Sequence, residues 1–175
     1  MKHTPRLRIR IYLIFDLMKI LQKLYTAAAI TSLAAAVSFT APSAGRQAPF
    51  IDKYWVYESS TVVPAVDLDM DGKPDNSISV LLEECQEDDA RMFKGSGKIV
   101  EDYGKNKCGD DEVSSEETGD WTYNAATRQL STKDYNTDEP EILTLREISA
   151  SRMVLVRVFR SNKGEHTITA VYKTR

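Results

Sequence analysis

Short segments rich in Val, Ile, Thr and aromatic residues follow one another along this chain, and Gly, Asn, Asp and Pro separate them. No long stretch keeps a helical period. We expect β-strands at 53–63, 77–84, 90–95, 97–103, 119–124, 128–134, 141–148, 152–160 and 165–174. The short turns between them indicate an antiparallel meander. Without covering helices, such a meander exposes its edges and its apolar face unless it closes on itself or pairs into a sandwich.

The alternation of apolar and polar residues is clearest in the segment 77–84. Ile78, Val80 and Leu82 are spaced two residues apart, so in a strand they share one face. This pattern predicts a half-buried strand at 77–84.

The N-terminal segment 1–44 is predicted to be a secretory signal peptide. An Ala-rich apolar stretch over 24–39 follows two lysines, and small residues lead to the exit at position 44. Met18 opens this signal better than Met1, so we predict Met18 as the true start, with a longer signal from Met1 as the alternative. The stretch is too weakly apolar for a membrane span. We therefore expect an exported protein, periplasmic, cell-surface or extracellular, without a transmembrane segment.

The rest of the chain is long enough for one domain of ordinary size. We assign 45–52 to a short linker and 53–175 to the domain. Residues 45–175 carry 17 Lys and Arg against 25 Asp and Glu. Because phosphate binding needs a basic face, this balance argues against nucleic acid as a partner.

Two cysteines, Cys85 and Cys108, remain after the predicted signal. An even count in an exported chain favours one disulfide, and closing a loop of this length stabilises the fold by roughly 3 kcal/mol. The alternative is a reactive or metal-binding pair, but the two residues have neither a CxxC spacing nor a nearby His. We therefore predict a Cys85–Cys108 disulfide.

Several motifs succeed one another in a characteristic order along nearly the whole region from Lys53 to Lys173. They are Trp55, Asp67-Leu68-Asp69-Met70-Asp71-Gly72-Lys73-Pro74-Asp75, Cys85 with Glu87-Asp88-Asp89, Phe93 with Gly95, Cys108, and Gly119-Asp120-Trp121. This order resembles the secreted lipocalin-like domains of Bacteroidota. The resemblance implies an all-β fold, an antiparallel up-and-down barrel of about eight strands whose interior holds one small ligand. Lys53 departs from the GxW opening typical of lipocalins, where Gly is expected.

The segment 67–75 has the spacing of a calcium-binding loop. Carboxylates at alternate positions and a Gly that permits a sharp turn let oxygen ligands converge on a hard cation. The candidate metal ligands are Asp67, Asp69, Asp71, the carbonyl of Lys73, and Asp75. Ile78 stands where an EF-hand has its bidentate Glu, so a complete site needs an outside carboxylate. The alternative is an exposed turn that binds no ion, and Ca²⁺ is the only cofactor we consider.

Aromatic residues on the expected strands are the candidates for lining a ligand cavity. They are Trp55, Tyr57, Phe93, Trp121 and Tyr123. The alternative is that they fill the barrel as ordinary core. Arg157 alternates with Met153, Leu155 and Phe159, and we expect it to be a surface Arg rather than a ligand anchor.

Catalytic motifs are weak in this sequence. His166, the one His after the predicted signal, lies in a Thr/Ile/Val strand, and no GxSxG context provides a nucleophile. We therefore expect a non-enzymatic barrel that binds a small apolar ligand or has a structural or interaction role at the cell envelope. The alternative function is a calcium-stabilised protein-interaction module that uses the Asp67–Asp75 loop. No residue pattern identifies the protein partner.

Overall fold

The computed structural model describes residues 48–109 and 113–175. The predicted signal peptide 1–44 and the predicted start at Met18 lie outside the described residues. Among the residues described, no helix is long and apolar enough to cross a membrane.

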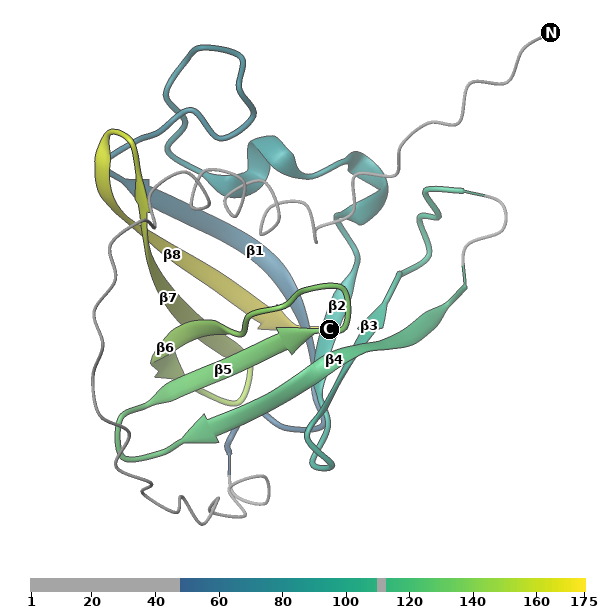
Figure 1. The fold of residues 1–175 in the computed structure, drawn as a ribbon. Helices are drawn as coiled ribbons and strands as arrows, with labels where there is room; N and C mark the ends of the chain where they lie inside the picture. Colours follow the sequence, from purple (N-terminus) through teal and green to yellow (C-terminus); the bar gives the residue numbers. More distant parts are fainter. Residues whose placement is uncertain (1–47, 110–112) are drawn as a thin grey trace, which may run out of the picture.

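The strands of the described chain form a closed antiparallel barrel in chain order, in which β8 returns to pair with β1 (Figure 1). They are β1 (Tyr54–Val63), β2 (Ala90–Phe93), β3 (Lys98–Asp102), β4 (Ser115–Asn124), β5 (Gln129–Asp134), β6 (Glu141–Ile148), β7 (Arg152–Ser161) and β8 (Gly164–Thr174). The predicted all-β barrel of about eight strands is confirmed. Closure pairs both edges of the meander, which removes the exposed edges that an open sheet would leave.

The prediction of a strand at 77–84 is wrong. The segment forms a 3₁₀ helix η2 (Ile78–Leu81), and a second short helix η3 (Glu84–Gln86) follows. The Ser77 hydroxyl caps η2 by accepting the N–H of Ser79 at 3.2 Å. β2 pairs only with Tyr54–Val56 of β1. Beyond that point the segment attaches to β1 irregularly, because the Ile78 N–H donates to the Ser60 side chain Oγ at 2.9 Å rather than to a strand carbonyl. Ile78 is buried in the core and Leu81 is partly buried against it, while Val80 is 45% exposed.

Strand β4 begins four residues before the predicted strand 119–124. Ser115 and Glu116 pair with Asp102 and Glu101 of β3, so the acidic stretch continues the ladder. Gly119 allows β5 to approach closely, because a Cβ at this position would lie 2.4 Å from the carbonyl oxygen of Lys133.

One end of the barrel is filled by aromatic side chains. The ring of the fully buried Phe50 has its centroid 5.3 Å from that of Phe93, 5.4 Å from that of Trp121 and 5.3 Å from that of Tyr123. The indole N–H of Trp55 donates to the Phe50 carbonyl at 2.8 Å. Phe50 belongs to 45–52, which we expected to be a linker. The described part of that range therefore contributes to the core rather than only connecting to it.

A second apolar cluster lies beneath the connection between β1 and β2. It consists of Val62, Val66, Leu68, Ile78, Ile168 and Ala170. In Figure 1 this connection, coloured blue to teal and carrying the two short helices, lies at the top of the view beyond the strands. The connection therefore covers the barrel at this side through side chains such as Leu68 and Ile78.

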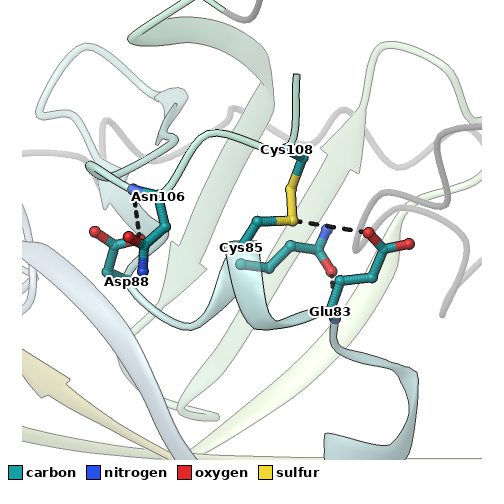
Figure 2. The surroundings of a disulfide bond; sticks show 6 residues. Glu83, Cys85, Asp88, Asn106 and Cys108 are labelled. Atoms are coloured by element: carbon teal, nitrogen blue, oxygen red, sulfur yellow. Dashed lines mark hydrogen bonds between the residues drawn. A yellow bond between two sulfur atoms is a disulfide. The ribbon is translucent and has the colours of Figure 1, made fainter. Parts of the chain in front are cut away.

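The predicted disulfide fastens this connection to the chain between β3 and β4 (Figure 2). Cys85 of η3 and Cys108 have Cα atoms 5.2 Å apart and are bonded through their sulfur atoms. Beside them, Asp88 accepts the backbone N–H of Lys105 at 2.7 Å and that of Asn106 at 3.4 Å. A covalent link and hydrogen bonds thus hold the same two segments together.

Candidate functional site

A small cavity of about 40 Å³ lies in the barrel interior, between the two apolar clusters. Its apolar wall consists of Trp55, Ile78, Phe93, Leu143, Met153, Leu155, Ile168 and Ala170. Its polar wall consists of Arg91, Glu141, Arg157 and Tyr172. The cavity therefore combines a predominantly apolar lining with one polar side, which is the composition typical of small-molecule sites.

The predicted aromatic residues divide between this cavity and the filled end. Trp55 and Phe93 line the cavity. Trp121 and Tyr123 instead pack on Phe50 in the filled end. Tyr57 packs edge-on against Tyr172, with ring centroids 6.2 Å apart, and donates its hydroxyl to Ser60 Oγ at 2.9 Å. Strand alternation turns such residues inward, but only the depth along the barrel decides which of them reach the cavity.

Two Arg–carboxylate pairs occupy the polar side. Arg157 Nε lies 2.8 Å from Glu141 Oε1, and their side chains are only 18% and 14% exposed. Arg91 forms a second, largely buried pair with Glu101 of β3. The expectation that Arg157 is a surface residue is wrong, because it follows Met153 and Leu155 on the inward face of β7.

Sequence reasoning missed Arg91, Glu101 and Glu141 as interior residues. The available signal was the alternation of each strand. Arg91 lies two residues before the buried Phe93, and Glu141 lies two residues before the buried Leu143. Each charge therefore shares the inward face of its strand with a core residue.

Burial controls protonation on this side of the barrel. It raises the pKa of Glu101 above its ordinary value, and the neighbouring Arg91 opposes that change. Burial also raises the pKa of the Tyr172 phenol to about 12, against the opposing effect of Arg91. Tyr172 therefore remains a neutral hydroxyl that is able to donate a hydrogen bond throughout the physiological pH range.

The aspartate loop brings three of its five predicted ligands together. Carboxylate oxygens of Asp67, Asp69 and Asp71 lie within 4.8 Å of one another. The N–H of Gly72 donates to Asp67 Oδ2 at 3.0 Å, and Gly72 has a φ of 90°, which favours glycine. The other oxygen, Asp67 Oδ1, is buried and accepts no hydrogen bond from the described residues.

Asp75, the fifth predicted ligand, makes other contacts, and so does the side chain of Lys73, whose carbonyl is the predicted ligand at that position. Asp75 Oδ2 accepts the N–H of Leu68 at 2.8 Å, and the backbone of Asp75 bridges to Val66. The ammonium group of Lys73 lies 3.1 Å from Asp71 Oδ2 on the surface. Asp75 thus closes the base of the loop, and the Lys73 ammonium offsets part of the negative charge of the loop.

His166 is a satisfied core residue in the described structure. Its Nδ1 donates to the Pro64 carbonyl at 2.8 Å, and its Nε2 lies 2.8 Å from Ser161 Oγ. The ring stacks on Phe159 with centroids 5.1 Å apart and is 2% exposed. These contacts join β7 and β8 to the end of β1.

No protein-family model matches this chain, and no curated protein matches it. Among solved structures, it is similar to a complex of bovine odorant binding protein with a selenium-containing odorant, at 8% identity and a TM-score of 0.36. The alignment covers 84% of this chain and 78% of that chain. A likeness at this level carries no argument about a ligand, and the barrel assignment here rests on the strand pairing itself.

Proposed function

We propose that this protein binds a small, mostly apolar molecule inside its barrel and acts as a binding protein rather than an enzyme. The observation that carries the proposal is the interior cavity, whose wall is apolar except for the side formed by Arg91, Glu141, Arg157 and Tyr172. The predicted signal peptide and the Cys85–Cys108 bond support an exported location. Membership of the secreted lipocalin-like group of Bacteroidota is part of the same proposal and rests on the motif order.

The size of the cavity limits what enters without rearrangement. Its volume of about 40 Å³ holds about three water molecules, whereas an engineered apolar cavity of about 150 Å³ accepts benzene. A ligand with an aromatic ring therefore requires part of the wall to move. Ile78 lies on a helix of four residues in the covering connection, and Met153 has an adaptable side chain, so these two residues are the best placed to yield.

Calorimetric titration of the mature protein with toluene tests this proposal. Saturable binding is expected, and Ile78→Ala should tighten it because the truncated side chain enlarges the cavity. Val80→Ala, on the exposed side of the same helix, is the matched control and should leave the affinity unchanged. Ala170→Leu should abolish binding by filling the cavity. Absence of toluene binding to both the wild type and Ile78→Ala, with both folded, would contradict the proposal.

A second candidate function is a calcium-stabilised interaction module. The observation that favours it is the buried Asp67 Oδ1, which has no hydrogen-bond partner among the described residues and lies beside Asp69 and Asp71. A divalent cation coordinated by these carboxylates supplies the missing partner. The loop lies between Val66 and Ile78, two members of the second cluster, so a bound ion stabilises the connection that covers the barrel.

Thermal unfolding in millimolar calcium and in EDTA tests the second candidate. Binding to the folded state alone adds about 2.7 kcal/mol at a hundredfold excess over Kd, which corresponds to a rise of several degrees in Tm. Asp69→Asn combined with Asp71→Asn should remove the rise, whereas Asp138→Asn, an exposed change outside the loop, should preserve it. Equal Tm values in calcium and in EDTA would exclude the candidate.

A further inference from the structure

The polar side of the cavity contains charges that are already paired. Arg157 lies against Glu141 with 2.8 Å between Nε and Oε1, and Arg91 lies against Glu101. Each pair joins one cation and one anion, so the four side chains together add no net charge when they are ionised. All four are largely shielded from solvent.

This pairing discriminates between ligand groups. A ligand carboxylate or ammonium brings a further charge into a poorly solvated site, where it must remain uncompensated or disrupt an existing pair. Either result carries a large desolvation penalty. A neutral group adds no charge, and a hydroxyl accepts from a guanidinium N–H and donates to a carboxylate oxygen within the same pair.

Tyr172 adds a neutral donor to the same wall. Its phenol is neutral at pH 7, and burial moves it further from ionisation by raising its pKa to about 12. The wall therefore offers donors from Arg91, Arg157 and Tyr172, and an acceptor from Glu141. The rest of the lining, including Leu155 and Ile168, is hydrocarbon.

The geometry points to a ligand class: a small hydrocarbon body that carries one uncharged hydroxyl, placed against the Arg157–Glu141 pair. This inference rests on the proposed function and specifies its ligand. It excludes carboxylate-bearing and amine-bearing molecules of the same shape as preferred ligands.

Four ligands of matched shape test the inference at pH 7: toluene, benzyl alcohol, benzoate and benzylamine. Benzyl alcohol should bind about tenfold more tightly than toluene, the effect of one well-formed hydrogen bond in a buried site. Benzoate and benzylamine should both bind more weakly than toluene. Equal affinities for toluene and benzyl alcohol, or tightest binding of either ion, would overturn the inference while leaving the proposed function in place. Failure of all four ligands to bind both the wild type and folded Ile78→Ala would overturn the inference and the proposed function together.

Two variants locate the selectivity in the pair. Glu141→Gln removes one negative charge beside Arg157, so the preference should move from benzyl alcohol to benzoate. Arg157→Met combined with Glu141→Leu removes the pair, so the advantage of benzyl alcohol over toluene should disappear while toluene still binds. Glu147→Gln, an exposed change on the same strand, is the control and should leave the ranking unchanged. Thermal unfolding verifies that each variant is folded, and an unchanged ranking in Glu141→Gln would overturn the role of the pair.

Discussion

The two halves of the barrel interior have the same strand alternation and different contents. In the filled half, Phe50, Phe93 and Trp121 pack ring against ring, and the Trp121 indole N–H donates to the Lys94 carbonyl at 2.9 Å. In the other half, the inward positions carry Arg91, Glu101, Glu141 and Arg157, and a cavity remains beside them.

The difference shows how inward residues determine whether a barrel is filled or hollow. Aromatic rings are large and rigid, so a few of them fill the cross-section and satisfy their N–H groups locally. Ion pairs hold their side chains in fixed geometries, and here the apolar residues around them leave a void. One half thus mainly stabilises the fold, and the other half carries the proposed binding site.

Phe50→Ala should have the largest effect, because it removes the centre of the filled half. Phe50 is fully buried, and the loss of its ring should lower the free energy of unfolding by about 3 to 5 kcal/mol. Urea unfolding measures this change. Val158→Ala, at a side chain 55% exposed on the outer wall, is the control and should cost below about 1 kcal/mol. Equal costs would mean that residues before β1 do not belong to the core.

Removal of the disulfide should have the next largest effect and should act on the half covered by the β1–β2 connection. Cys85→Ser combined with Cys108→Ser should lower the free energy of unfolding by roughly 3 kcal/mol, because the unfolded chain gains loop entropy. Wild-type protein in reductant should behave like the double variant when both are compared in urea. The same unfolding midpoint for the double variant and the oxidised wild type would argue against the bond.

A matched pair of leucines compares the two halves directly. Both leucines belong to the buried apolar cluster that contains Phe50, but Leu155 lines the cavity and Leu130 does not. Leu130→Ala should cost about 1 kcal/mol more than Leu155→Ala, because a side chain that already faces a void loses fewer contacts when truncated. Denaturant unfolding of the two variants measures the difference. A larger cost at Leu155 would show that the cavity closes in solution.

The smallest expected effect is a pH dependence in the polar half. The raised pKa of Glu101 means that the folded state holds this proton more tightly than the unfolded state does. Its contribution to stability is therefore present at low pH and declines as the pH rises from about 4.5 through the folded-state pKa. Glu101→Gln should lack this decline when urea unfolding at about pH 4 and about pH 7 is compared.

The exposed change Glu117→Gln is the control for this experiment and should keep the wild-type pH dependence. If Glu101→Gln has the same pH dependence as the wild type, the burial of Glu101 does not influence stability in this range.

The sequence by itself determined the all-β class, the antiparallel order of the barrel strands and the cysteine pair. These features depend on local alternation and turn residues, which can be recognised in short stretches of sequence, and on a count of cysteines. β7 and β8 illustrate this, since their register runs without a shift from Arg152 opposite Lys173 to Ser161 opposite Gly164. Alternation alone was misleading at 77–84, where the spacing of Ile78, Val80 and Leu82 was that of a strand.

Tertiary structure decided the conformation of the segment 77–84 and the composition of the candidate site. The segment forms η2 beside the part of β1 that lies beyond its pairing with β2, where the Ile78 N–H donates to Ser60 Oγ and the Ile78 side chain is buried in the second cluster. Arg157 pairs with Glu141 because β7 and β6 hold these residues at the same depth in the barrel. Trp121 lies away from the cavity because β4 holds it at a different depth. Depth in a barrel is set by register and closure across all the strands, which no local stretch of sequence encodes.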